Sequence, residues 1–586
     1  MLADAPIDQR PSRLPDWAIL VAFCVAFSLQ VVLTITRESA TFDEPANLGS
    51  GYVELTRGDD WLLPQNLPFV KRLASLPLLF VDVKVPPPPY SSPLYGNEAR
   101  LFGQRLLYEV NDGDRLLLLG RLAVLPLALL LGSLLFLWAK QLFGRAAALL
   151  ALALYTFEPN ILAHSGLVTS DLAVACLMFA VIYGFKLLTQ RVTLPRLLLP
   201  AVACGVALVT KFTLLLLVFI LLLLGLLVSF SRQVLDFNII GIPRRSVTSP
   251  AGKLLALLPV FLLWALVAFV IVWATYGFSY ERFSAERIAE AKPWNLVPPS
   301  QFFFLQKAIL SARQVKLLPG AYLNGFNWLL ARSGRNRAYL LGQVRPGGWW
   351  YFFLVTFLIK TPVALLILIG LALWVQRRRW REDPLQTAFL LVPVVVYFTI
   401  ISAVGWNIGH RHLLPIYPFL FVVVSSLIPW AVQRRPLAKA GLACLGAWYL
   451  AASLSIFPHY LAYFNELVGG PNQGYKYLVD SNLDWGQDLK NLKRYMEDSH
   501  ISRVWLSYFG TARPEYYAIA YNPLPSFAPL DRRGDTYPTP YVAISATNLQ
   551  GVYVRGLSPD WDLFKEFRTR QPIAKIGYSI FVYRLE

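Results

Sequence analysis

Asp43 and Glu44 are the acidic pair in this sequence whose position is most suited to chemistry. They follow residues 17–36, a run of twenty residues without a charge that is long enough to cross the hydrocarbon core of a bilayer as a helix. Carboxylates placed just after such a segment lie where lipid headgroups, water and a low dielectric meet. A base in this position can act on a lipid-linked substrate. The structural alternative is that Asp43 caps a short helix through Pro45.

Other ionisable residues lie inside or beside apolar segments, where they are energetically costly and therefore candidates for function. Cations near a phosphate leaving group offset its growing negative charge, and a carboxylate accepts the proton of an attacking hydroxyl. We therefore expect three carboxylates to act in catalysis and six basic residues to bind a donor phosphate. The carboxylates are Asp43, Glu44 and Asp171, and the basic residues are Lys71, Lys211, Lys360, His410, Arg411 and His412.

Each of these candidates also has a structural interpretation. Asp171 can cap the helix that it begins. Lys71 and Arg411 can reach headgroups as membrane anchors. Lys360 lies about eleven residues into a predicted helix over 349–376, roughly 16 Å along it at 1.5 Å per residue, and can pair with a carboxylate in the bundle. Lys211 has the same alternative.

The composition identifies the class of protein. Of the 586 residues, 56% are hydrophobic and only 15% are charged, which excludes an ordinary soluble protein. The net charge of +19 does not indicate nucleic-acid binding, because the arginines and lysines cluster in every second gap between apolar runs. This distribution is the positive-inside pattern of a multi-pass membrane protein.

The apolar runs predict an all-α membrane protein of about eleven transmembrane helices. A cytoplasmic N-terminus places the basic gaps inside and the C-terminus outside the cell membrane. Two long outer loops then cover about 37–114 and 277–348, and the apolar spacing of residues 100–110 predicts a helix lying flat on the membrane. The predicted spans are 17–36, 115–138, 142–163, 171–189, 195–209, 212–230, 254–276, 349–376, 386–405, 413–432 and 440–457.

The chain becomes polar after residue 457, which divides it into a membrane domain (1–457) and a small extracytoplasmic α/β domain (458–586). Strand-like runs occur at 504–509, 541–546 and 578–583, with helical patterns near 486–498 and 560–569. Asp480, Asp484 and Asp488 superficially resemble a calcium loop, but Trp485 and the missing downstream glutamate favour a capped turn.

Several short motifs occur in order along nearly the whole chain. They are Thr41-Phe-Asp-Glu-Pro-Ala46 with Gly51-Tyr52 and Gly58-Asp59, His164-Ser-Gly-Leu-Val-Thr-Ser-Asp171, Tyr339-Leu-Leu-Gly342, Lys360-Thr-Pro362, Gly409-His-Arg-His-Leu-Leu-Pro415 and Asp480-Ser-Asn-Leu-Asp-Trp-Gly-Gln-Asp488. Together these motifs resemble those of the GT-C membrane glycosyltransferases, and most closely the bacterial relatives of protein O-mannosyltransferases and aminoarabinose transferases (family 39).

The resemblance implies an outward-facing cavity and inverting transfer of a sugar from a polyprenyl-phosphate carrier to an acceptor hydroxyl. It implies that Asp43 is the general base, that Lys71 and Arg411 contact the donor phosphate, and that Asp171 shapes the site. Relatives often read Pro-Glu-His-Pro-Pro-Leu-x-Lys before the phosphate lysine, whereas this chain has the amides Gln65 and Asn66 in place of the acid and the histidine.

The remaining alternatives concern the function and its partners. A transporter or flippase of a lipid-linked glycan would place its ionisable residues at mid-membrane depth, and a non-enzymatic scaffold would leave the outer charge cluster unexplained. No closed set of metal ligands is visible, so a cofactor requirement, including a divalent cation, stays open. The expected partners are membrane lipids, a polyprenyl-phosphate-linked sugar, and a glycan, lipid or protein acceptor.

Overall fold

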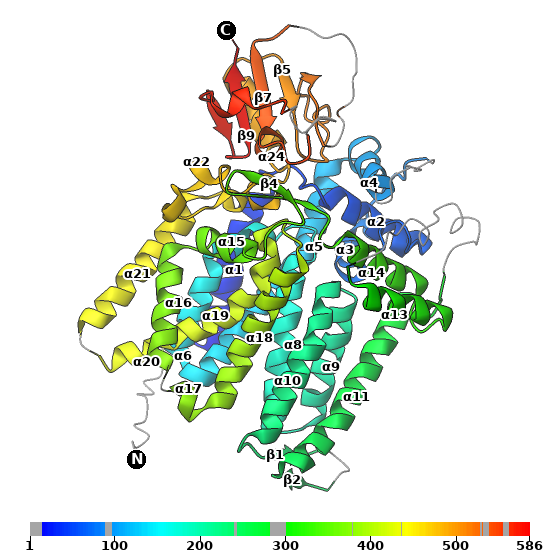
Figure 1. Cartoon of the computed structure of the whole chain (residues 1–586). Helices are drawn as coiled ribbons and strands as arrows, with labels where there is room; N and C mark the ends of the chain where they lie inside the picture. The colour runs from blue at the N-terminus through cyan, green and yellow to red at the C-terminus, as the bar shows by residue number, and fades with distance from the viewer. Residues whose placement is uncertain are drawn as a thin grey trace.

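A bundle of apolar helices carries a small sheet domain at one end in the computed structural model (Figure 1). The structure describes residues 14–87, 97–239, 243–281, 301–377, 379–434, 436–527, 530, 538–554 and 562–585. Eight helices among these residues are long and apolar enough to span a membrane. They are α1 (Asp16–Ile35), α5 (Gly113–Phe143), α8 (Asp171–Gln190), η2–α10 (Phe212–Phe230), α11 (Pro250–Thr275), α18 (Pro384–Val404), η3–α19–α20 (His410–Val432) and α21 (Pro436–Ser455).

The other three predicted spans also correspond to helices, although not to straight spanning ones. Helices α6 (Arg145–Thr156) and α9 (Leu194–Leu208) are shorter than the eight. The span predicted over 349–376 is a pair, α15 (Phe352–Lys360) and α16 (Val363–Gln376), bent by 109° at Thr361–Pro362. Because proline disfavours the helical conformation of the residue before it, the chain turns there. Lys360 therefore lies at a break, and the prediction of a continuous helix was wrong.

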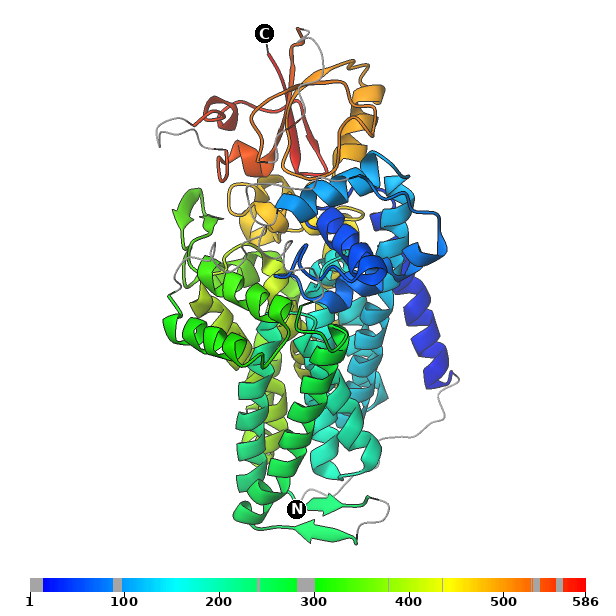
Figure 2. The same ribbon diagram turned by 90° about the vertical axis from the view of Figure 1, so that its right-hand side faces the viewer.

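The segments between the spans add helices at the end of the bundle that carries the C-terminal sheet (Figure 2). Helices α2 (Glu44–Arg57), α3 (Pro68–Ser75), η1 (Leu76–Phe80) and α4 (Asn97–Tyr108) follow α1. Helices α13 (Phe303–Gln314) and α14 (Gly320–Arg332) precede a hairpin of β3 (Arg337–Leu340) and β4 (Gln343–Pro346). The short hairpin of β1 (Leu235–Phe237) and β2 (Arg245–Val247) lies at the opposite end.

Helix α4 does not lie flat on a membrane with its apolar face in lipid, as the sequence pattern predicted. Phe102, Leu106 and Leu107 are at most 1% exposed because they pack inside the protein. Gly103 permits this, since a Cβ atom there would lie 2.0 Å from the carbonyl oxygen of Pro45 on α2. The close approach of the two helices fixes the start of α2, where Asp43 and Glu44 stand.

The C-terminal part forms a five-stranded mixed sheet in the order β6-β5-β7-β9-β8. Strand β5 pairs in parallel with β6 and β7, and β9 pairs antiparallel with β7 and β8. The bounds are β5 Val504–Ser507, β6 Tyr521–Pro523, β7 Tyr541–Ser545, β8 Ala574–Ile576 and β9 Ile580–Arg584.

Three of these strands were predicted; β6 and β8, of three residues each, were not. Helix α23 (Leu489–Asp498) fits the predicted helix, and α24 (Ala546–Leu549) follows β7. The helix predicted over 560–569 is reduced to the single turn η7 (Glu566–Arg568) in its described part, residues 562–569. Its first two residues lie outside the described residues.

Candidate active site

Asp43 lies in the tight loop between α1 and α2, directly before the first residue of α2. It makes no side-chain hydrogen bond to the first turn of α2, so the capping interpretation does not hold. Its Oδ2 instead lies 3.2 Å from Nη1 of Arg411, and its side chain is 36% exposed. Asp43 therefore combines a cationic neighbour with access for a substrate.

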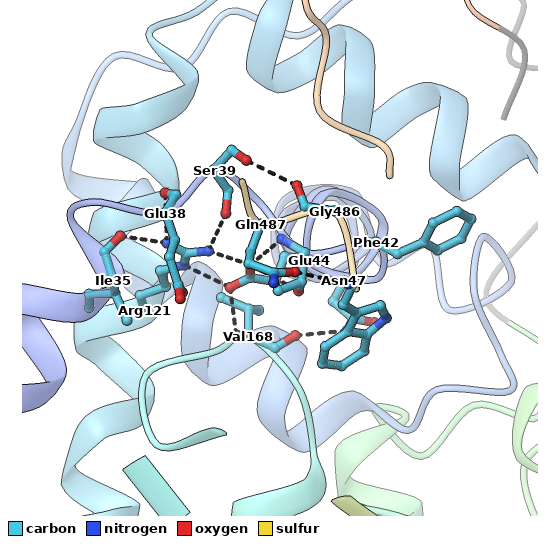
Figure 3. Close-up of polar contacts among 12 residues, drawn as sticks. Ile35, Glu38, Ser39, Phe42, Glu44, Asn47, Arg121, Val168, Gly486 and Gln487 are labelled. Atoms are coloured by element: carbon cyan, nitrogen blue, oxygen red, sulfur yellow. Dashed lines mark hydrogen bonds and ion pairs between the residues drawn. The ribbon is translucent and has the colours of Figure 1, made fainter. Parts of the chain in front are cut away.

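The loop around Asp43 is held by the turn at residues 485–487 (Figure 3). The backbone N–H groups of Ser39 and Phe42 donate to the carbonyl oxygens of Gln487 and Trp485, at 2.9 and 2.8 Å. The hydroxyl of Ser39 donates to the carbonyl oxygen of Gly486 at 3.0 Å. A polar segment from the C-terminal part thus fixes a loop of the membrane bundle, and with it the position of Asp43.

Glu44, which the sequence predicted to act in catalysis, lies inside the protein. It is fully buried, and both of its oxygens accept hydrogen bonds (Figure 3). Arg121 on α5 donates to Oε1 at 2.9 Å and to Oε2 at 2.6 Å, and the backbone N–H groups of Thr41 and Val168 add bonds of 2.8 and 3.0 Å. Burial alone would raise the pKa of Glu44, but Arg121 and these donors hold it below its usual value. Glu44 is therefore a charged anchor for the loop.

Arg121 is a site residue that the sequence analysis missed. Its guanidinium also donates to the carbonyl oxygens of Ile35 and Ser39, at 2.7 and 2.9 Å, so it binds the end of α1 as well as Glu44. The available signal was its charge inside the run predicted to span the membrane at 115–138, six residues beyond Arg115 at the edge of that run.

Arg411 is the centre of the charge cluster. Its Nη1 lies 3.2 Å from Asp43 and 3.5 Å from Oδ2 of Asp171, and its guanidinium stacks over the ring of Trp485 at 4.1 Å. The side chain is only 11% exposed. Its Nε is buried and has no hydrogen-bond partner among the described residues. Arg411 therefore keeps a donor for a further anion after binding two carboxylates.

Asp171 and Lys211 extend this cluster. Asp171 is the first residue of α8, 2% exposed, and its Oδ1 lies 2.6 Å from Nζ of Lys211. The cap position belongs to Ser170, and the carboxylate of Asp171 binds Lys211 and Arg411, so the capping interpretation of Asp171 does not hold. Lys211 also lies 3.4 Å from Nδ1 of His412, whose Nε2 has no hydrogen-bond partner within the described ranges.

Lys71, predicted to contact the donor phosphate, is buried in a separate ion-pair network. It is 3% exposed, forms a salt bridge with Glu54 and donates to the carbonyl oxygen of Leu63 at 2.9 Å. Arg72 joins the same network through Glu54 at 3.0 Å and Asp60 at 2.5 Å. A lysine in this environment does not reach lipid headgroups, and the phosphate contact of Lys71 stays a prediction.

Lys360 and His410 also serve the packing of the protein. Nζ of Lys360 donates to the carbonyl oxygens of Leu461 and Asn482 at 2.8 and 2.6 Å. The backbone N–H of His410 donates to the side-chain oxygen of Asn482 at 2.7 Å, and its Nε2 lies 2.7 Å from the hydroxyl of Tyr417. These contacts join the break between α15 and α16 to the segment that leads into the C-terminal sheet.

Asn66, one of the two amides singled out in the sequence, contacts helix α2. The side chain of Asn66 donates to that of Asn47 at 2.7 Å, and Asn47 donates to the carbonyl oxygen of Val168 at 2.8 Å. Across the described part of the chain, no group of three or more histidine, cysteine, aspartate or glutamate side chains is arranged to hold a metal ion.

This chain is similar to one known protein family and to several solved structures. Residues 107–240 match the family model described as dolichyl-phosphate-mannose-protein mannosyltransferase. The structure of ArnT from Cupriavidus metallidurans bound to undecaprenyl phosphate is similar over 97% of this chain and 98% of that chain, with 14% identity and a TM-score of 0.44.

An archaeal oligosaccharyltransferase, AglB from Archaeoglobus fulgidus in complex with an inhibitory peptide and a dolichol-phosphate, is similar over 89% of this chain and 62% of that chain. The identity is 13% and the TM-score 0.43. No curated protein matches the sequence. The matched segment 107–240 carries Arg121, Asp171 and Lys211, and the predicted resemblance of this chain to the membrane glycosyltransferases is confirmed by that family match.

Proposed function

We propose that this protein transfers a sugar from a polyprenyl-phosphate donor to an acceptor hydroxyl, with Asp43 as the general base. The acceptor oxygen attacks the anomeric carbon from the face opposite the phosphate, the bond to phosphate breaks, and the configuration at the anomeric carbon inverts. Asp43 receives the acceptor proton as the new carbon–oxygen bond forms. Its partial exposure beside a buried cation is the geometry that this step requires.

The observation that carries the proposal is the incomplete pairing of Arg411. This guanidinium is nearly buried between Asp43 and Asp171, yet its Nε lacks a hydrogen-bond partner among the described residues. A buried donor without a partner is costly, and an anionic ligand removes that cost. A phosphate oxygen beside Arg411 and Lys211 would lie close to the base and would be stabilised as it leaves.

We place the reaction on the extracytoplasmic side of the cell membrane. Arg244 and Arg245 belong to a basic gap at the end of the bundle opposite the C-terminal sheet, and short basic gaps face the cytoplasm by the positive-inside rule. The sheet and the Asp43 loop then face outward. In this proposal residues 1–457 form the transferase domain and residues 458–586 the outer domain, and a polyprenyl-phosphate sugar reaches the site from the lipid.

The test uses the purified chain in detergent with a panel of polyprenyl-phosphate sugars and a crude acceptor extract. Release of free polyprenyl phosphate is compared for wild type, Asp43→Asn and Arg411→Met. We expect turnover of one donor, loss of at least about 100-fold in Asp43→Asn because the base is removed, and a large rise in donor KM for Arg411→Met. Asp16→Asn, at the far end of α1, is the matched control.

Wild-type turnover by Asp43→Asn would refute the assignment of the base. Absence of turnover with every donor, with a folded protein, would refute the transferase and favour movement of the lipid-linked glycan across the membrane. That second function predicts alternating access, which site-directed labelling of a cysteine introduced beside Asp43 from either side of a vesicle would detect.

A further inference from the structure

An aromatic cluster joins the Asp43 loop to the C-terminal domain. Phe42, the residue before Asp43, stacks on Phe509 with 5.3 Å between ring centroids. Phe509 stacks in turn on Tyr553 at 5.6 Å, and Phe527 packs against Tyr553 at 4.9 Å. Phe509 is buried, whereas Phe42 and Tyr553 are partly exposed and Phe527 is 48% exposed. The cluster therefore presents ring surface to solvent beside the proposed base.

A carboxylate stands at the edge of this aromatic cluster. The hydroxyl of Tyr553 donates to Oδ2 of Asp480 at 2.6 Å, and the backbone N–H of Ser481 donates to Oδ1 at 2.5 Å. Burial raises the pKa of Asp480, while the hydrogen bonds from Tyr553 and Ser481 and the charge of Arg411 act to lower it.

The backbone of Asp480 is held in an unusual conformation. Its φ of 58° is in the left-handed region, which is uncommon for a residue other than glycine. The surrounding structure enforces it, since the N–H of Asp480 donates to the hydroxyl of Thr547 on α24 at 3.0 Å and its carbonyl oxygen accepts from Leu483 and Asp484 at 2.9 Å. Such enforced strain is typical of functional positions. Here it directs Asp480 toward Tyr553 and the site.

We propose that Asp480, Tyr553 and the rings of Phe42 and Phe527 form an acceptor subsite for a carbohydrate ring. This inference rests on the proposed function and names the substrate class of its acceptor. A sugar ring has an apolar face that packs on aromatic surface and hydroxyl groups that donate to carboxylates. A ring held this way brings a hydroxyl of the same sugar, or of its neighbour, to Asp43.

The charges of this region favour a carbohydrate over an anionic acceptor. Asp480 and Asp43 are both carboxylates, and the neighbouring cation Arg411 already binds Asp43 and is assigned to the donor phosphate. An acceptor with a phosphate next to Asp480 would meet repulsion. A neutral or positively charged sugar meets hydrogen-bond acceptors and ring faces, which fix its orientation.

The test measures binding of a panel of neutral and amino oligosaccharides to the full chain in detergent, without donor. Wild type is compared with Tyr553→Ala, Tyr553→Phe and Asp480→Asn. Tyr541→Phe on β7 and Asp498→Asn, exposed at the end of α23, are the matched controls. We expect one class of glycan to bind wild type and both controls, and to bind Tyr553→Ala and Asp480→Asn about tenfold more weakly, the size of one lost hydrogen bond to a charged group.

Tyr553→Phe keeps the ring and removes only the hydroxyl that binds Asp480. Its glycan binding can therefore be measured in place of that of Asp480→Asn if the latter variant does not fold. Binding of no glycan, or glycan binding that these variants leave unchanged, overturns the subsite. Binding of peptides or phospholipids in place of glycans does the same. The donor-cleavage assay separates the two proposals. Glycan binding without donor turnover would refute the transferase but not the glycan-binding site. Donor turnover without glycan binding would refute the subsite alone.

Discussion

Removing Arg121 should destabilise the protein far more than removing a surface cation from the same helix. The guanidinium is 1% exposed, it neutralises the fully buried Glu44, and it satisfies the carbonyl oxygens of Ile35 and Ser39. Breaking a buried pair by deleting one partner typically costs about 3–5 kcal/mol. Carbonyls left without a donor add about 1–3 kcal/mol each where water does not reach them. For Arg121→Met we therefore expect a loss of at least about 3 kcal/mol in the free energy of unfolding.

The surface comparison is the salt bridge between Lys140, near the end of the same helix, and Asp16. These side chains are 44% and 32% exposed, so the pair is solvated and its loss in Lys140→Met should cost no more than about 1 kcal/mol. Denaturant titration in a mild detergent, followed by tryptophan fluorescence, measures both changes under the same conditions.

A double-mutant cycle isolates the ion pair. Glu44→Gln combined with Arg121→Met removes both charges, so the double variant should be more stable than the sum of the single losses implies, by about 1–3 kcal/mol. The pKa of Glu44 is lowered in the folded protein, so its contribution is present above its ordinary value of 4.5 and is lost as the pH falls through the folded value. Strict additivity, or an Arg121→Met loss equal to that of Lys140→Met, would refute this account of the loop.

Three further predictions follow from the buried charges. Lys71→Met should lower the free energy of unfolding by about 3–5 kcal/mol because it leaves Glu54 buried without its main cation; denaturant titration measures the loss. Lys360→Met should cost about 1–3 kcal/mol for each of the two buried carbonyls that lose their donor, measured in the same way. Burial raises the pKa of Glu38 to about 8, so the folded state binds its proton more tightly than the unfolded state does. Stability should therefore fall as the pH rises from about 4.5 to 8, and Glu38→Gln should flatten that slope in unfolding curves taken across this range.

Controls decide each of these three cases. Lys439→Met, at an exposed position of α21, should leave the unfolding curve almost unchanged. If Lys71→Met were as stable as Lys439→Met and raised only the donor KM, the result would support the predicted contact of Lys71 with the donor phosphate. A stability of Lys360→Met equal to that of the control would mean that water reaches the two carbonyls. An unaltered pH slope in Glu38→Gln would assign the proton uptake to another group.

Hydropathy predicted the helices well because a helix in a membrane satisfies its own backbone hydrogen bonds and needs only sufficient apolar length. All eleven predicted segments correspond to helices. Proline at 362 bends one of them, and its effect depends on the packing around Lys360, which a residue pattern does not contain. The strands β6 and β8 were missed because three residues are too few to show an alternation of apolar and polar side chains.

The roles of the charged residues depended on pairing over long sequence separations. Glu44 and Arg121 are 77 residues apart, and Asp43 and Arg411 are 368 apart. Residue type and position predicted that all these groups gather at one end of the bundle. Only the structure distinguishes the charged residues that are neutralised inside the protein, such as Glu44 and Lys71, from the charged residues that keep an exposed oxygen or a hydrogen-bond donor without a partner among the described residues.

The contact between Asp43 and Arg411 links donor binding to the activity of the base in the proposed reaction. Without a donor, Arg411 shares one nitrogen between Asp43 and Asp171, and this contact holds the carboxylate of Asp43. A phosphate that binds the guanidinium must take over part of this contact, since the anion and the carboxylate attract the same charge. The carboxylate of Asp43 is then released from Arg411 toward the acceptor hydroxyl only when a donor is present. Because Asp171 also binds Lys211, Arg411 remains anchored through Asp171 while its contact with Asp43 is exchanged.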